Sequence, residues 1–108
     1  MKHNPPTRAQ ALDIARRMKR RMTAGGIPVV QVYVFGSLAE GNPHPWSDID
    51  IAVVYEPFGK DRLEEHATIS HYRDTFDLPM DIVTLRKEDI GNRYSTIVRE
   101  VNEHGIPA

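Results

Sequence analysis

Three short runs of β-branched and aromatic residues limit the folds that are open to this chain. The runs span residues 29–35, 49–55 and 80–85, and Gly or Pro residues lie close to each of them. This composition, bounded by residues that interrupt regular structure, is typical of buried β-strands. The intervening segments have helical patterns, so the sequence predicts an α/β (α+β) fold in which helices pack against a short mixed β-sheet.

The spacing of apolar residues predicts the helices. Thr7 is suited to cap the first of them, and Gly25 and Gly26 end it before Pro28. Its apolar residues recur at intervals of three and four and therefore share one face: Ala11, Ile14, Ala15, Met18 and Met22. A mostly polar helix is expected over residues 60–76, a single turn over 86–90, and a last helix over 94–105.

The length of 108 residues predicts a single domain over residues 1–108, with residues 1–6 as a flexible tail. The chain has no Cys, which excludes disulfides, thiolate nucleophiles and Cys-based zinc sites. We find neither the apolar segment of a signal peptide nor a run long enough to span a membrane. These features lead us to expect a cytoplasmic protein that does not act at a membrane.

The net charge of −1 conceals an uneven distribution of charge. Residues 1–28 carry seven cations and one acid, whereas residues 29–108 carry seven cations and fourteen acids. Five of the cations lie in residues 16–21. We expect this basic run to be either a solvated helix face or a docking surface for an acidic partner, RNA or the phosphates of a nucleotide.

Two aspartates alternate with apolar residues at the start of the second predicted strand. Side chains alternate between the faces of a strand, so Asp48 and Asp50 point to one face while Ile49 and Ile51 point to the core. Adjacent carboxylates repel each other unless they share a cation, and oxygen ligands suit Mg²⁺ or Mn²⁺. If the second and third strands are neighbours, Asp81 completes a group of three carboxylates able to hold two metal ions.

A glycine-containing turn follows the first predicted strand. Gly36 allows the backbone to approach a ligand closely, and Ser37 offers a hydroxyl and an amide to a phosphate. A phosphate-binding turn followed by a metal-binding Asp-x-Asp strand is the arrangement that transfer from a nucleoside triphosphate requires. Each part alone would also fit ordinary turn and surface chemistry, so the prediction rests on their combination.

This combination resembles the minimal nucleotidyltransferases of the DNA polymerase β-like nucleotidyltransferase superfamily. The shared pattern is G-S-x-x-x-G, then five residues, then S-D-I-D, and it matches Gly36, Ser37, Gly41 and residues 47–50. The order of the predicted helices and strands is also similar, so the resemblance covers nearly the whole chain. It implies a nucleotidyltransferase-like fold.

The resemblance also implies roles for individual residues. Asp48, Asp50 and Asp81 would be the catalytic residues and would ligate two Mg²⁺ or Mn²⁺ ions. Asp81 would in addition help to deprotonate the acceptor hydroxyl. The residues implied to bind the triphosphate, with ATP as the expected nucleotide, are Gly36, Ser37 and Ser47.

Two residues depart from the pattern of many relatives, which have basic residues two and four places after the glycine. This chain has Leu38 and Glu40 at these places, and the carboxylate of Glu40 would repel a triphosphate unless it pointed outward. Candidates to supply the missing positive charge are the basic run of residues 16–21, Lys60 and Arg62.

The resemblance implies a metal-dependent enzyme that moves AMP from ATP to a hydroxyl group and releases pyrophosphate. Because 108 residues leave no room for an acceptor-binding domain, we expect either a homo-oligomer or a protein partner. Stand-alone relatives often pair with a HEPN-domain toxin, and some add AMP to its tyrosine, which implies an antitoxin role; nucleic acid would enter only as an acceptor. The alternative is a degenerate, non-catalytic module that neutralises its partner by contact.

Overall fold

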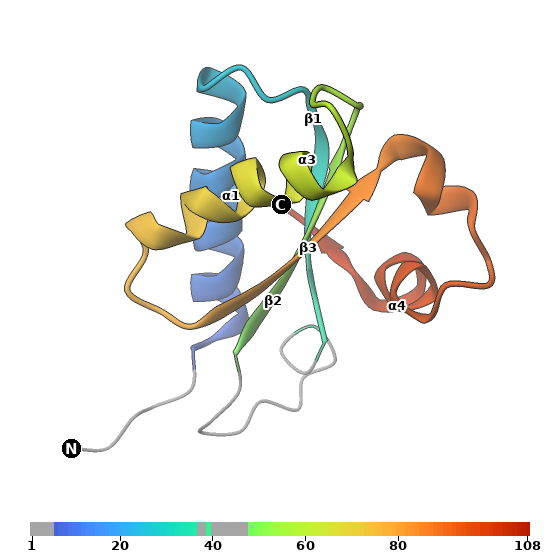
Figure 1. The fold of residues 1–108 in the computed structure, drawn as a ribbon. Helices are drawn as coiled ribbons and strands as arrows, with labels where there is room; N and C mark the ends of the chain where they lie inside the picture. The colour runs from blue at the N-terminus through green and yellow to red at the C-terminus, as the bar shows by residue number, and fades with distance from the viewer. Residues whose placement is uncertain (1–5, 37–38, 40–47) are drawn as a thin grey trace.

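The structure, a computed structural model, describes residues 6–36, 39 and 48–108. The elements follow the chain in the order α1 (Arg8–Ala24), β1 (Val29–Phe35), β2 (Ile49–Tyr55), α3 (Arg62–Ser70), the 3₁₀ helix η1 (His71–Thr75), β3 (Met80–Arg86), the 3₁₀ helix η2 (Lys87–Gly91), α4 (Thr96–His104) and β4 (Ile106–Pro107). Figure 1 shows their arrangement. Within the described ranges, no helix is both long enough and apolar enough to cross a membrane.

The four strands form one mixed sheet in the order β3-β2-β1-β4. Strand β1 is antiparallel to both β2 and β4, whereas β2 and β3 are parallel. The predicted mixed sheet is therefore confirmed, and so is the pairing of the second and third predicted strands. Strand β4 was not predicted, because it has two residues and one of them, Pro107, lacks the amide of a typical strand residue.

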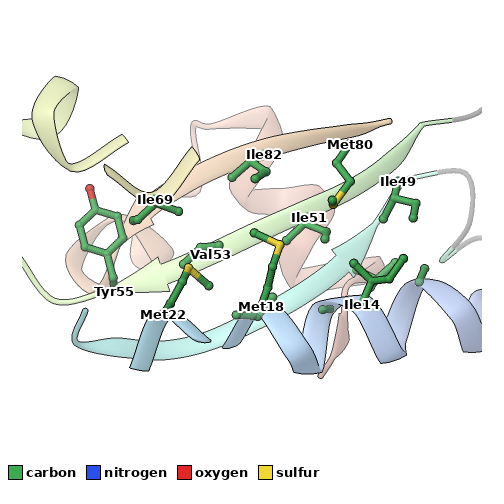
Figure 2. Close-up of a cluster of buried hydrophobic side chains, with 14 of the residues drawn as sticks. Ile14, Met18, Met22, Ile49, Ile51, Val53, Tyr55, Ile69, Met80 and Ile82 are labelled. Atoms are coloured by element: carbon green, nitrogen blue, oxygen red, sulfur yellow. The ribbon is translucent and has the colours of Figure 1, made fainter. Parts of the chain in front are cut away.

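One face of the sheet is covered by α1 and α3 and contains the largest core cluster (Figure 1). The predicted cap of α1 is confirmed, since the amide of Gln10 donates to the Thr7 hydroxyl over 3.0 Å. Met18 and Met22 point from α1 toward the strands, as Figure 2 shows. The labelled core residues on the strands facing these helices are Ile49, Ile51, Val53, Tyr55, Met80 and Ile82.

The helix predicted over residues 60–76 is shorter in the structure. It begins only at Arg62, because the side chain of Asp61 accepts the amide of Glu64 over 2.9 Å and so caps the first turn. After Ser70 the chain tightens into η1. Tyr72 of this turn and Phe76, which follows it, are half-buried and pack against the core cluster.

The other face of the sheet is covered by α4. Val98 packs with Val54 and Leu85, and Val101 packs with Phe35 and Ala52. Along β2, Ala52 and Val54 alternate with the residues of the first core cluster, as the two-residue repeat of a strand requires. The two faces of β2 are thus packed against different helices.

Glu65 is a charged residue that the structure buries completely. Its Oε1 accepts hydrogen bonds from the Tyr55 hydroxyl over 2.9 Å and from Arg86 Nε over 2.8 Å. Its Oε2 accepts the amides of Phe58 over 2.8 Å and Gly59 over 3.1 Å. The carboxylate therefore connects α3 to β2, β3 and the segment that links β2 with α3.

Candidate active site

The strand register brings the predicted site residues to one end of the sheet. Phe35, the last residue of β1, is opposite Asp50 in β2, and Asp50 is beside Asp81 in β3. Gly36 follows β1 directly and Asp48 precedes β2 directly. Gly36 and the three predicted aspartates are therefore adjacent in space, at the end of the sheet where β1 ends and β2 and β3 begin.

The acids lie on the face of the sheet that carries α4. Asp50 shares a face with Ala52 because they are two positions apart along β2, and Ala52 packs against Val101 of α4. Asp81 is exposed, while Asp48 and Asp50 are half-buried. The other face of the same strands, with Ile49 and Met80, is closed by the core. Among the described residues, the acids are therefore open on the α4 side and at the end of the sheet.

Mutual repulsion and burial change the ionisation of Asp50. Its pKa is raised from 3.8 to about 6, first by burial and then by the negative charges of Asp81, Asp48 and Glu100. The same three aspartates were singled out by the sequence. Asp48 and Asp81 lie near enough to Asp50 for their negative charges to disfavour its ionisation, as the strand register leads us to expect.

Glu100 is an acid at this site that the sequence analysis missed. It is half-buried on α4, next to Val101, which packs against Phe35 and Ala52. A signal was present in the sequence, because a residue beside the apolar stripe of a helix lies at the edge of the buried face. The pairing of α4 with the acidic face of the sheet, however, is a tertiary contact that helical periodicity cannot reveal.

We expect Glu100→Gln to lower the pKa of Asp50, because the substitution removes one of the negative charges that raise it. A ¹³C NMR titration of the Asp carboxylates would measure the change. Glu103→Gln is the matched control, since this exposed acid lies on the same helix and is not among the causes of the shift. An unchanged Asp50 pKa in Glu100→Gln would contradict the prediction.

Gly36 lies directly against the Asp50 carboxylate. Its φ of +74° is in the left-handed region, and a Cβ at this position would overlap the Asp50 side chain. The residue that follows β1 therefore has to be glycine for two separate reasons. One is the backbone conformation and the other is the close approach to the acidic group.

Gly36→Ala is expected to lower the free energy of unfolding by about 1–2 kcal/mol through its φ angle and to displace Asp50 as well. Gly26→Ala is a matched control, because Gly26 has a φ of +92° but a Cβ there meets nothing within 4 Å. Urea unfolding should show similar losses of stability for both variants. Only Gly36→Ala should change the Asp50 pKa, and an equal change in both variants would contradict this account.

The structure places the candidate cations Lys60, Arg62 and residues 16–21 away from the acids. Lys60 and Arg62 follow the far end of β2, and Arg62 binds Asp89 beyond the far end of β3. In α1 it is Arg8, at the start of the helix, that reaches the predicted phosphate-binding segment, where its Nη2 donates to the Ala39 carbonyl over 2.9 Å. Residues 16–21 begin about 12 Å further along the helix. The suggestion that Lys60, Arg62 or the basic run supplies charge to the triphosphate is therefore not supported by their positions.

Some predicted residues lie outside the part of the chain that the structure describes. These are Ser37, Leu38, Glu40, Gly41 and Ser47. Within residues 6–36, 39 and 48–108, no group of three or more His, Asp or Glu side chains is arranged to hold a metal ion. The donors present do fit a divalent cation in their chemistry, because they are carboxylate oxygens on neighbouring strands whose negative charges raise the Asp50 pKa.

Comparisons with solved structures identify proteins of similar fold. A protein of Sulfolobus solfataricus named as a candidate nucleotidyltransferase superposes with a TM-score of 0.67 and 19% identity, covering 93% of this chain and 80% of that chain. A toxin–antitoxin structure with AMP-PNP gives 0.57 and 25% identity, covering 84% and 69%. A mutant of the toxin–antitoxin MntA-HpeT gives 0.51 and 20% identity, covering 86% and 70%.

The sequence comparisons are of two kinds. No curated protein matches this chain. The family described as "Nucleotidyltransferase domain" matches residues 13–105, which include both sides of the candidate site. The chain therefore belongs to the nucleotidyltransferase domain family.

Proposed function

We propose that this protein is a metal-dependent nucleotidyltransferase that moves AMP from ATP to a hydroxyl group of a partner protein. The observation that carries the proposal is the register that sets Asp50 beside Asp81, with Gly36 against the Asp50 carboxylate. Family membership supports the reaction class. The similar toxin–antitoxin structure with AMP-PNP supports an adenine nucleotide.

Asp48, Asp50 and Asp81 would hold two Mg²⁺ or Mn²⁺ ions, and binding would have to draw their side chains together. When bound, such ions neutralise the triphosphate and stabilise the attacking and leaving oxygens. The MntA-HpeT mutant similar in fold carries two Asp→Glu substitutions two residues apart, which is the spacing of Asp48 and Asp50. This agreement in spacing supports the proposed ligand pair.

The remaining chemistry falls to residues of the chain. Gly36, together with Ser37 and Ser47, would hold the triphosphate so that its α-phosphorus faces the exposed Asp81. The acceptor oxygen forms a bond to that phosphorus while the bond to the β-phosphate oxygen breaks, and pyrophosphate leaves. Asp81 accepts the acceptor proton and passes it to water. Arg8 would hold the segment containing Ala39 close to α1.

The proposed acceptor is a tyrosine of a HEPN-type toxin, and the protein would act as its antitoxin. Two of the similar structures are toxin–antitoxin assemblies, which supports a protein partner. The alternative is neutralisation by contact alone. It is favoured by Glu40, a carboxylate in the segment implied to bind the triphosphate, and by the uneven charge of the chain.

An assay with labelled ATP distinguishes nucleotidyl transfer from neutralisation by contact alone. The protein is incubated with Mg²⁺, the product of the neighbouring gene and ATP labelled in either the α- or the γ-phosphate. Transfer of the α-label alone is the expected result, whereas transfer of the γ-label would indicate a kinase. The contact mechanism would be established if the protein inhibited the neighbouring gene product without transferring label, and if the Asp48→Ala plus Asp50→Ala variant inhibited it equally strongly. The same result would refute the enzymatic mechanism.

A further inference from the structure

The outer side of α1 forms a hollow of positive charge away from the candidate active site. We call it the basic hollow. Its lining residues are Arg16, Lys19, Arg20, Thr23, Ala24 and Ala108. In an α-helix, residues 16, 19, 20 and 23 lie on one stripe, opposite the face that α1 buries in the core.

Two arginines of the basic hollow have no partner among the described residues. Elsewhere on α1, Arg17 pairs with Asp13 over 3.0 Å, and Arg21 donates to Thr75 over 2.6 Å. These contacts hold Arg17 and Arg21 on the other flank of the helix. Arg16 and Arg20 are exposed and form no ion pair or hydrogen bond within the described ranges.

Lys19 at the inner wall of the hollow is fixed by the fold. Its Nζ donates to Gln31 Oε1 over 2.9 Å and to the Ala108 carbonyl over 3.3 Å. Within the described residues, these two acceptors bind Lys19 and not Arg16 or Arg20. The hollow therefore has one wall held by hydrogen bonds and two guanidinium groups without a partner in the described part of the chain, about 6 Å apart along the helix axis.

We propose that the basic hollow binds an acidic segment of a partner protein, through two carboxylates one helical turn apart. Acids at positions i and i+4 of a partner helix have the same axial spacing as Arg16 and Arg20, and planar guanidinium groups bind carboxylates in a bidentate manner. The proposal names the docking surface for the partner in the proposed function and rests on that function. Complementary charge at this surface would accelerate association and orient the partner.

The composition of the surface favours protein over nucleic acid. Among the described residues that line the basic hollow there is no aromatic side chain, although proteins that bind single strands stack bases on such residues. The chain as a whole has a net charge of −1, unlike typical nucleic-acid-binding domains.

A labelled helical peptide tests the proposal directly. The probe carries Glu pairs at i and i+4, its counterpart carries Gln instead, and fluorescence anisotropy measures binding at low salt. Arg16→Gln plus Arg20→Gln should weaken Glu-peptide binding about tenfold, because two partly exposed ion pairs are lost. The matched control, Arg73→Gln plus Arg93→Gln, removes the same charge elsewhere and should change binding less than twofold.

The other occupants are outcomes of the same experiment. Tighter binding of a single-stranded RNA of equal charge, lost in the Arg16/Arg20 variant, would overturn the proposal in favour of nucleic acid. Self-association of the wild type in sedimentation that the variant abolishes would overturn it in favour of a second copy. Equal binding of the Glu and Gln peptides, or equal weakening by the control variant, would also overturn it.

Failure of this proposal is distinguishable from failure of the proposed function. The basic hollow lies beyond the middle of α1, so Arg16→Gln plus Arg20→Gln should leave ATP binding, measured with a fluorescent ATP analogue, unchanged. Loss of peptide binding with ATP binding intact is the expected pattern for this variant. If the wild type bound the Glu peptide but never transferred the α-phosphate of ATP, the proposed function would be refuted. The docking surface would still be supported.

Discussion

Replacing Asp50 by Asn is expected to slow nucleotidyl transfer by about 1000-fold or more and to stabilise the metal-free protein at neutral pH. The loss of rate follows from the proposed role of Asp50 as a metal ligand, since metal ions supply several kcal/mol of transition-state stabilisation. The gain in stability follows from the raised pKa of this carboxyl group. The two effects are measured separately, by α-label transfer and by urea unfolding.

The gain in stability should depend on pH in a defined way. Asp50 has a pKa of about 6 in the folded state and 3.8 as the ordinary value, so ionising it costs the folded state more than the unfolded state. The wild type should therefore lose stability as pH rises from about 4 to about 6. Two pKa units correspond to at most about 3 kcal/mol, and because Asp50 is only half-buried we expect about 1 kcal/mol.

Asp50→Asn lacks this ionisation, so its stability advantage should be absent near pH 4 and complete at pH 7. Adding Mg²⁺ at pH 7 should raise the melting temperature of the wild type but not of the variant. Asp74→Asn, an exposed aspartate in η1, is the control and should change neither activity nor the pH profile. Full transfer activity in Asp50→Asn, or an advantage independent of pH, would refute the account of the site.

Replacing Glu65 by Ala should cause a large loss of stability. The substitution removes the shared acceptor of Tyr55, Arg86 and two backbone amides, and it leaves the guanidinium of Arg86 without its buried partner. Removing one member of a buried network costs several times more than removing a surface pair. We expect the melting temperature to fall by about 10–20 °C, which calorimetry would measure.

The matched control is Glu64→Ala, because Glu64 is the exposed neighbour in the same turn of α3. It should shift the melting temperature by only a few degrees. Glu65→Gln adds a test of the charge. Burial alone would raise the pKa of Glu65, but hydrogen bonds from the Gly59 amide, Arg86, the Phe58 amide and Tyr55 lower it to about 2.

A lowered carboxyl pKa contributes stability that is present above the ordinary value of 4.5 and is lost as pH falls toward about 2. The wild type should show this loss in acid, and Glu65→Gln should not. Equal melting temperatures for Glu64→Ala and Glu65→Ala would show that the network contributes little. An identical acid profile for the wild type and Glu65→Gln would show that the charge is irrelevant.

The predictable parts of this fold are those encoded locally. The cap at Thr7, the end of α1 at Gly25 and the alternation along β2 depend on neighbouring residues, and the structure confirms all three. The same alternation places Asp50 on the face of the sheet that is turned away from α1, and the strand register places it beside Asp81. The catalytic and metal-binding roles of these acids stay predictions.

The features that the sequence did not reveal depend on contacts between distant segments. Glu65 looks like any acid in the first turn of a helix until Tyr55 and Arg86 are brought to it by the sheet. Glu100 contributes to the site only because α4 packs on the acidic face. The basic run was recognised from composition, but its distance from the site is set by the direction of α1 relative to β1.

The separation of β2 into two differently packed faces has an evolutionary consequence. Alternate residues of this strand, such as Ile49 and Ile51, pack in the core under α1 and α3, and Asp50 on the other face is one of the acids that we assign to catalysis. A substitution at an acidic position leaves the packing against α1 intact, and at Asp50 it relieves repulsion as well. If selection for catalysis relaxed while selection for partner binding persisted, loss of the acidic residue would therefore not be opposed by a loss of stability. Within such a lineage, an enzyme can become a purely binding antitoxin by a single change that makes the fold more robust.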